Sequence, residues 1–208
     1  MGNDYGGDWA FSVTIFPLDC IVTFVWVVIV LASYTSHIIY PGEEIPEAYF
    51  STRYATLRQP IGMSEGSERL TDDHEAIHCF LSHGEHIISV GRLHLIPETS
   101  DGAAKDHDGP DATLIPSFSP LTTDDTSNRP AVQIRQMGTL ESFRNRGCAR
   151  KVLDILEHEG KTYFGAKVGF LQAREKALNF YQKSGWSIID DPYEIGKIGL
   201  HRSMIKRF

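Results

Sequence analysis

The sequence predicts an α/β fold in which helices flank one mixed sheet, and three observations support this prediction. Residues 131–140 alternate between apolar and polar side chains at the two-residue period of a strand. Residues 149–158 place apolar side chains at helical spacing, and Gly160 then ends the helix. A strand and a helix follow again at residues 166–173 and 174–185. This repeated order is the connectivity that buries a mixed sheet between helices.

The first predicted helix covers residues 45–57. A turn at residues 41–42 precedes it, and the Pro-containing run 58–62 ends it. The side chains expected to face the core are Ala48, Tyr49, Thr52 and Leu57.

Two strands and a long loop come next. Residues 75–81 and 87–95 are expected to form an antiparallel pair, which a hairpin turn at residues 82–85 joins. Residues 97–130 are rich in Asp, Ser, Thr, Gly and Pro, and carry too few apolar side chains to fold alone. We expect them to be a flexible surface insertion in a domain that spans residues 34–208.

Residues 1–33 form an apolar N-terminal extension with three competing interpretations. It is a membrane anchor formed by residues 9–32, a hydrophobic segment packed on the domain or a partner, or a dispensable extension. The anchor is ranked first, although the roughly 20 apolar residues of a span are reached only if residues 11–18 take part. Because the first arginines follow this segment, an inserted anchor would leave a cytoplasmic catalytic domain.

Charge and cysteine content narrow the class of protein. The first 52 residues carry six acidic and no basic side chains, which leaves 20 basic and 21 acidic side chains, a net charge of −1, for the rest. No nucleic-acid partner is expected, because such proteins show a clear basic excess. Three widely spaced cysteines, an odd number, indicate a reducing compartment rather than a disulfide framework.

The turn at residues 143–150 has the composition of an anion-binding site. Gly147 lets neighbouring backbone N–H groups point together at the positive end of a helix, and Arg144 and Arg146 lie beside it in the sequence. The run lacks both the Gly-x-Gly-x-x-Gly and the P-loop pattern. We therefore expect the turn to bind a pyrophosphate, but not that of a dinucleotide held by a Gly-x-Gly-x-x-Gly turn or of a nucleotide held by a P-loop.

Three motifs in order resemble the GNAT superfamily of acyl-CoA-dependent N-acyltransferases. Residues 144–149 fit its Arg/Gln-x-x-Gly-x-Gly/Ala signature, and residues 135–140 resemble its coenzyme-facing strand. Residues 174–186, with a Phe-Tyr pair before Lys-x-Gly-Trp, resemble its fourth helix. Residues 57–62 and the tail at 193–206, read as one final strand, are similar to the ElaA-like subgroup.

The resemblance implies a GNAT fold, with a central, mostly antiparallel mixed sheet. It implies an acetyltransferase that moves an acetyl group from acetyl-CoA to a primary amine of an unidentified small-molecule or peptide acceptor. A homodimer is compatible with it. The insertion at 97–130 would then lie over the acceptor groove. The alternative is a non-catalytic module that binds acyl-CoA or a partner.

The resemblance also assigns site residues. Tyr181 corresponds to the tyrosine that protonates the coenzyme thiolate, a role that a phenol can fill because its pKa near 10 exceeds that of a thiol. The coenzyme-binding residues are expected to be Met137, Gly138, Thr139, Arg144, Asn145, Arg146, Gly147, Cys148 and Ala149. No metal site is expected, and Cys148 is interpreted as a compact side chain rather than a nucleophile.

Two points stay open in the sequence. The general base is unassigned, with four candidates in Glu141, Glu194, His201 and His78. The chain also departs from the family pattern at Gly138, Asn145 and Arg174, and the arginine puts one side-chain contact with the coenzyme in doubt.

Overall fold

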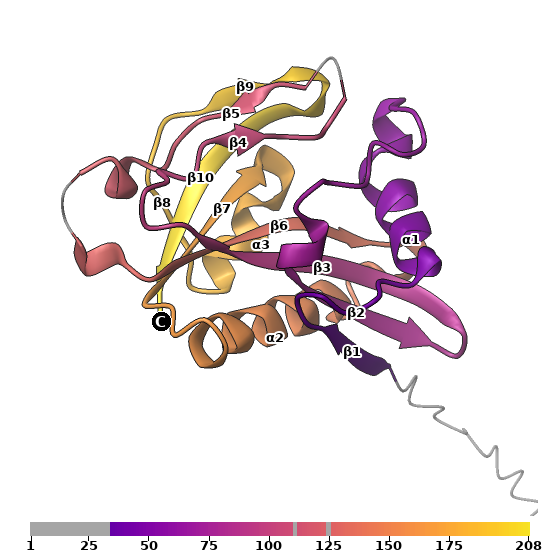
Figure 1. Ribbon diagram of the computed structural model, residues 1–208. Coiled ribbons are helices and arrows are strands. Elements are labelled where there is room, and N and C mark those ends of the chain that lie inside the picture. Colours follow the sequence, from indigo (N-terminus) through magenta and orange to yellow (C-terminus); the bar gives the residue numbers. More distant parts are fainter. Residues whose placement is uncertain (1–33, 110–111, 124–125) are drawn as a thin grey trace, which may run out of the picture. The chain divides into compact units, whose positions relative to one another are not determined.

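The computed structural model describes residues 34–208 except 110–111 and 124–125 (Figure 1). The apolar extension 1–33, and with it the predicted anchor at 9–32, lies outside the described residues and stays a prediction. Within the part that is described, no helix combines the length and the apolar character needed to cross a bilayer.

An eight-stranded sheet forms the centre of the domain. Its order is β1-β2-β3-β6-β7-β10-β8, and β9 pairs with β10. Only β6 and β7 run parallel, and every other pair is antiparallel, which confirms the predicted mixed, mostly antiparallel sheet. The strands are β1 Thr35–Ile39, β2 Ile77–His83, β3 His86–Ile96, β6 Ala131–Thr139, β7 Val168–Arg174, β8 Ser187–Ile188, β9 Tyr193–Ile195 and β10 Gly199–Arg207.

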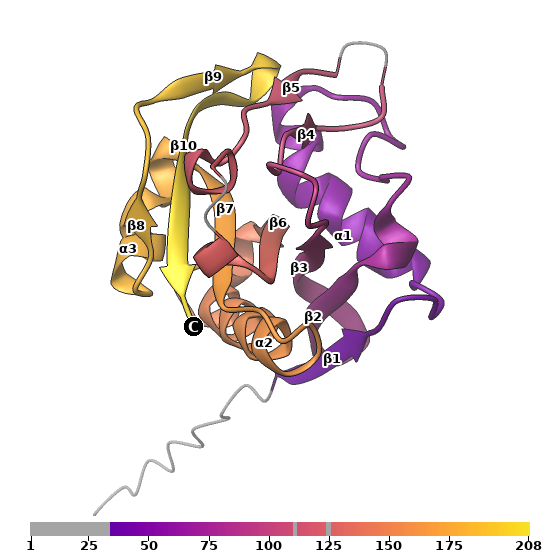
Figure 2. The same ribbon diagram turned by 60° about the vertical axis from the view of Figure 1, so that its left-hand side comes forward.

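Helices cover both faces of this sheet (Figures 1 and 2). Helices α2 (Cys148–Thr162) and α3 (Leu178–Lys183) lie on one face, where the largest apolar cluster is buried. Helix α1 (Glu47–Leu57) lies on the other face over β3 and β6. Short 3-10 helices lie at η1 Gln59–Ile61, η2 Asp73–Glu75, η3 Ser119–Leu121, η4 Thr126–Asn128, η5 Glu141–Phe143, η6 Glu175–Ala177 and η7 Gly196–Ile198.

Helix α1 differs from its predicted form in the face that it buries. Ala48 is exposed, so this expectation is wrong, whereas Leu57 is half-buried and packs against Gly138 of β6. The buried side chains are Tyr49, Phe50, Thr52, Arg53 and Thr56. Periodicity missed this face because Arg53 is a charged residue, and its burial depends on an ion pair with the remote Asp73.

The tail also differs from its prediction as one strand. Residues 193–207 form a hairpin in which β9 pairs back on β10 through η7. Gly196 and Gly199 have φ values of +39° and +94°, which let the chain reverse there. The predicted helix 174–185 is likewise shorter, because β7 extends through Arg174 and η6 precedes α3.

Residues 97–130 pack on the α1 face of the sheet. Their described part contains the small hairpin of β4 (Ala104–Lys105) and β5 (Leu114–Ile115), seen between α1 and β10 in Figure 2. Phe118 is fully buried, and its ring stacks on Phe170 of β7 with a centroid separation of 4.7 Å. The segment therefore gains its apolar contacts from the sheet and not from itself; its flexibility stays a prediction.

Strand β6 separates from its parallel neighbour halfway along its length. It pairs with β7 only from Ala131 to Gln133, whereas its pairing with β3 continues to Thr139. Two residues of β6, Gln136 and Met137, lie opposite the single Gly91 of β3 in a β-bulge. Gln136 has a φ of 55°, rare for a residue with a side chain. The edge of β6 beyond Gln133 is thus left without a strand partner on the β7 side.

The end of β6 also lies closely under α1, which accounts for the glycine at position 138. A Cβ atom there would meet Thr56 Oγ1 at 2.1 Å and Thr56 Cβ at 2.8 Å. The departure of Gly138 from the family pattern is therefore a packing requirement of the helix above it.

We predict that Gly138→Ala lowers the free energy of unfolding by about 1 to 3 kcal/mol, because the added methyl group overpacks this contact. Chemical denaturation of the variant measures the loss. A second substitution, Thr56→Ala, removes the nearest atom, so the double variant should lose less than the sum of the two single losses. Strictly additive losses would show that the two residues do not compete for space.

Candidate active site

The turn before α2 presents a row of free backbone N–H groups. Asn145 and Gly147 have φ values of 60° and 80°, and α2 begins at Cys148 with no side chain capping its first turn. Among the described residues, no oxygen accepts a hydrogen bond from the amides of residues 145–150. A Cβ atom on Gly147 would meet nothing within 4 Å, so the turn opens outward. Free amides at a helix N-terminus attract an anion.

Three arginines surround this turn. Arg144, Arg146 and Arg150 are exposed. Arg144 Nε donates to the carbonyl oxygen of Thr139 at 3.3 Å, and Arg146 lies 5.5 Å from the centroid of the Phe143 ring. Arg150 pairs with Asp154 at 2.7 Å. Two of the three positive charges therefore have no carboxylate within 4 Å among the described side chains.

Tyr181 of α3 lies beside the free edge of β6. Its hydroxyl is 3.6 Å from Met137 Sδ, although 44 positions separate the two residues in the chain. The tyrosine is buried, and burial raises the pKa of its phenol. The hydroxyl therefore keeps its proton at neutral pH, and a thioether is a weak partner for it. The structure thus brings together Tyr181 and the strand that carries Met137, Gly138 and Thr139.

Cys148 lies at the start of α2 but not in a form that suits a nucleophile. Its side chain is buried, and burial raises the pKa of its thiol. The thiol therefore stays protonated, in agreement with the interpretation of Cys148 as a compact side chain beside the turn.

Ala149, the last of the predicted coenzyme-binding residues, is half-buried.

His78 is a structural residue and not a general base. Its Nδ1 lies 3.1 Å from the Tyr49 hydroxyl and its Nε2 lies 2.8 Å from the Asp73 carbonyl, so both ring nitrogens are engaged. Burial lowers the pKa of His78 to about 4. Of the other candidates, Glu141 and Glu194 are exposed.

His201 has a different arrangement. Its Nδ1 lies 2.7 Å from the carbonyl oxygen of Gly199, so this nitrogen carries the proton and Nε2 keeps a free lone pair. Burial lowers the pKa of His201, and the adjacent Arg174 lowers it further. The ring is therefore neutral at neutral pH and able to accept a proton.

Sequence reasoning missed the charged groups buried on the α1 face. Arg92 holds both carboxylate oxygens of Asp72 at 2.8 Å, and it shares Asp73 with Arg53. These contacts join β3 and α1 to Asp72 and to η2, which begins at Asp73. The sequence around Arg92 carries no sign of these carboxylates, because they lie about 20 positions away in the chain.

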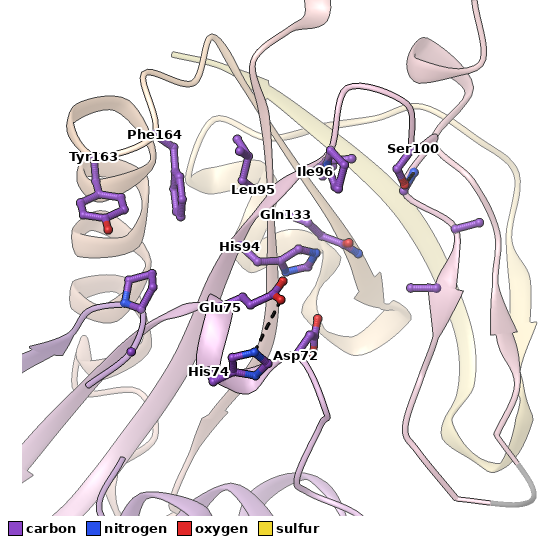
Figure 3. A pocket seen from close by; sticks show the side chains of 16 residues that line it. Asp72, His74, Glu75, His94, Leu95, Ile96, Ser100, Gln133, Tyr163 and Phe164 are labelled. Atoms are coloured by element: carbon purple, nitrogen blue, oxygen red, sulfur yellow. Dashed lines mark hydrogen bonds and ion pairs between the residues drawn. The ribbon is translucent and has the colours of Figure 1, made fainter. Parts of the chain in front are cut away.

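A cavity of about 750 Å³ lies beside β3 and β6, and His94 of β3 and Gln133 of β6 point into it, with Tyr163 and Phe164 after α2 on another wall (Figure 3). None of the predicted coenzyme-binding residues lines this cavity. It lies at the part of β6 that still pairs with β7, away from the free edge at Met137. No group of three or more metal-ligating side chains occurs within the described structure.

The candidate site thus consists of an opened strand edge, a tyrosine beside that edge and a turn of free amides. Comparison with known proteins then identifies the class. Residues 42–186 match the model of the acetyltransferase (GNAT) family. The chain belongs to this family.

The relatives agree with this assignment. An uncharacterized N-acetyltransferase, YitI of Bacillus subtilis, is 32% identical over 98 residues, which cover 46% of this chain and 65% of YitI. The match therefore spans slightly less than two thirds of that relative.

Solved structures share the fold at low sequence identity. A putative N-acetyltransferase from Lactobacillus plantarum has a TM-score of 0.56 at 19% identity, over 83% of this chain and 97% of that one. Escherichia coli ElaA has a TM-score of 0.56 at 15% identity, over 84% and 100%. Arabidopsis thaliana NAA60, solved in complex with acetyl-CoA, has a TM-score of 0.57 at 12% identity, over 84% and 98%.

The buried His78 predicts a loss of stability in acid. Its folded-state pKa of about 4 lies below the ordinary 6.5, so the unfolded chain binds the proton first as the pH falls. Stability is then full above about pH 6.5 and declines toward pH 4, by about 2 kcal/mol at pH 5 from this residue alone. Urea denaturation at pH 8 and pH 5 measures this decline, which should be smaller in His78→Gln. An equal decline in both proteins would contradict the assignment.

Proposed function

We propose that this protein transfers an acetyl group from acetyl-CoA to a primary amine. The observation that carries the proposal is the free edge of β6 beyond Gln133, which lies beside the hydroxyl of Tyr181 and leads to the open amides of residues 145–149. The family assignment supports an acyltransferase, and these features supply what the acetyl-CoA reaction requires.

The two halves of the coenzyme would be held by different backbone groups. The edge at Met137, Gly138 and Thr139 offers peptide groups that the amides of pantetheine match, as an added strand would. The amides from Asn145 to Ala149 offer hydrogen bonds to the pyrophosphate, whereas the Arg144 amide already donates to the Glu141 carbonyl; the side chains of Arg144 and Arg146 add positive charge.

Acyl transfer then needs few groups from the protein. The amine nitrogen attacks the thioester carbonyl carbon, and a backbone N–H of the β6 edge stabilises the charge on the carbonyl oxygen. When the carbon–sulfur bond breaks, Tyr181 donates its proton to the leaving sulfur. Burial keeps the phenol protonated at neutral pH, so the proton is present when the sulfur leaves, but the raised pKa by itself makes the phenol a weaker acid.

The amine must lose a proton, and His201 is our assignment for the base. Glu141 and Glu194 are exposed, and both ring nitrogens of His78 are engaged. His201 is buried and neutral, and its Nε2 has no hydrogen-bond partner among the described residues. It lies directly opposite Arg174 in the β7–β10 register, and Arg174 reaches the carbonyl oxygen of Leu57 above β6. In this proposal His201 acts from the α1 side of the opened strands, where the acceptor would enter.

The narrower expectations of the sequence stay predictions. They are the ElaA-like subgroup, a small-molecule or peptide amine as acceptor, a cytoplasmic location and a homodimer. ElaA supports the fold alone at 15% identity.

We predict that Tyr181→Phe lowers kcat by about 100-fold, because it removes the acid and keeps the aromatic ring. Tyr163→Phe is the control, since Tyr163 is exposed beyond α2. Release of free thiol measures turnover, and isothermal titration should show unchanged affinity for acetyl-CoA. Acetyl-CoA binding with no turnover of any amine by the unmodified protein would favour the non-catalytic module.

A second test addresses the turn itself. Gly147→Ala places a side chain at a φ of 80° and should weaken acetyl-CoA binding about 10-fold, because the amides no longer point together. Gly165→Ala is the matched control, with a φ of 61° and equally open surroundings. Isothermal titration compares the two. Equal affinities would remove the pyrophosphate from this turn.

The pH dependence tests His201. Because its pKa lies below 6.5, protonation of His201 should lower kcat/KM as the pH drops through that lowered pKa, in addition to the loss that protonation of the amine itself causes. His201→Gln should remove the first of these two losses and lower kcat/KM at neutral pH. An unchanged profile would exclude His201 as the base.

A further inference from the structure

We propose that Arg58, Arg135 and Arg174 bind a negatively charged group on the acceptor, so that the substrate is an amine that also carries a carboxylate or a phosphate. This inference rests on the proposed acetyl transfer and names the class of its acceptor. The three arginines come from the end of α1, from β6 and from the end of β7.

Arg174 lies beside the opened part of the sheet. It is the last residue of β7, past the point where β6 and β7 pair. Its Nη2 lies 3.4 Å from the carbonyl oxygen of Leu57. The Leu57 side chain in turn packs against Gly138, where a Cβ atom would lie 3.3 Å from Leu57 Cγ. The guanidinium therefore reaches across from β7 to the helix that covers the free end of β6.

Arg58 and Arg135 are held by two consecutive carbonyl groups of the insertion. Arg135 Nη2 donates to the carbonyl oxygen of Lys105 at 2.7 Å, and Arg58 Nη2 donates to that of Asp106 at 2.9 Å. These bonds use few of the five N–H donors of each side chain. Arg58 is 2% exposed, and its Nε has no partner among the described residues.

None of the three arginines has a carboxylate within 4 Å in the described structure, unlike their neighbours Arg53 and Arg92. The nearby Asp106 is occupied, since its Oδ1 accepts from the Thr113 amide and lies 3.0 Å from His107 Nδ1. Five arginines on this face thus meet four carboxylates, those of Asp72, Asp73, Asp106 and the buried Glu68, which also acts on Arg58. The arithmetic of 5 − 4 leaves an excess of one positive charge.

The pKa values of the three arginines reflect their burial and the uncompensated charge. Burial lowers the pKa of all three, and that of Arg135 falls to about 10. Arg58 and Arg135 are further lowered by the charges of neighbouring arginines. Cations that are removed from water without a counter-ion are unfavourable, and an anion would relieve this. The planar guanidinium fork matches a carboxylate or a phosphate.

The position of the charge also limits the size of the acceptor. Arg174 and His201 are directly opposite in the β7–β10 register, so the anion and the amine nitrogen are bound next to each other. An amino acid or a phosphorylated amino alcohol has this spacing. A long peptide whose nearest acidic group is remote from its N-terminus does not.

The first experiment compares matched acceptors with acetyl-CoA. L-amino acids are measured against their amides, and phosphoethanolamine against ethanolamine. We expect kcat/KM to be at least about 10-fold higher for the charged member of one pair, and the pair that responds separates carboxylate from phosphate. Equal use of charged and neutral amines would overturn this proposal and leave acetyl transfer intact.

Variants then test the arginines. Arg135→Gln and Arg174→Gln affect half-buried side chains and should each lower kcat/KM for the charged acceptor about 10- to 100-fold, mainly through KM. Affinity for acetyl-CoA should not change. Arg129→Gln is the control, because Arg129 also binds carbonyl groups, those of Pro97 and Ser100, in the same insertion. A similar loss in the control, or a loss confined to acetyl-CoA binding, would contradict anion recognition.

A binding test needs no turnover. Sodium glutarate should raise the melting temperature of the unmodified protein above its value in sodium chloride of equal ionic strength. The rise should vanish in the Arg135→Gln, Arg174→Gln double variant. No rise with glutarate or with inorganic phosphate would overturn the proposal. Absence of acetyl-CoA binding alongside a normal glutarate effect would instead refute the proposed function.

Discussion

The separation of β6 from β7 is the constraint on which the site depends. Peptide groups along a strand edge need partners, and β7 supplies them only as far as Gln133 before it pairs with β10 alone. The bulge at Gln136 and Met137 turns the remaining edge, and Gly138 admits α1 above it. The edge is therefore fixed in place by contacts on its other sides, so a ligand that completes its hydrogen bonds need not reorganise the strand.

The two faces of the sheet are stabilised by different interactions, and in our proposals they bind different substrates. The face under α2 and α3 carries the largest apolar cluster and buries Tyr181, so that its phenol keeps its proton at neutral pH. The α1 face holds buried arginines and aspartates and the insertion 97–130, whose carbonyl groups bind two of the arginines. In our proposals the coenzyme contacts the first face through α2 and α3, and the acceptor is recognised by charge on the second.

Elements whose signal is local were predicted well. The hairpin of β2 and β3, strand β6 and helix α2 follow from side-chain periodicity and turn residues. Where long-range contacts decide the structure, prediction was less accurate. The tail folds into β9 and β10 instead of one strand, and Arg53 is buried where Ala48 was expected. Neither outcome is visible in a short window, because Arg53 is neutralised by Asp73, 20 positions away.

The sequence by itself determined the turn before α2, since Gly147 permits the positive φ of that turn whichever elements surround it. Only the tertiary structure decided what lies beside the turn. It brought the hydroxyl of Tyr181 to Met137, and it gathered Arg58, Arg135 and Arg174 from three elements. The physical reason is that backbone geometry is a property of adjacent residues, whereas burial and charge pairing depend on partners that the fold alone brings together.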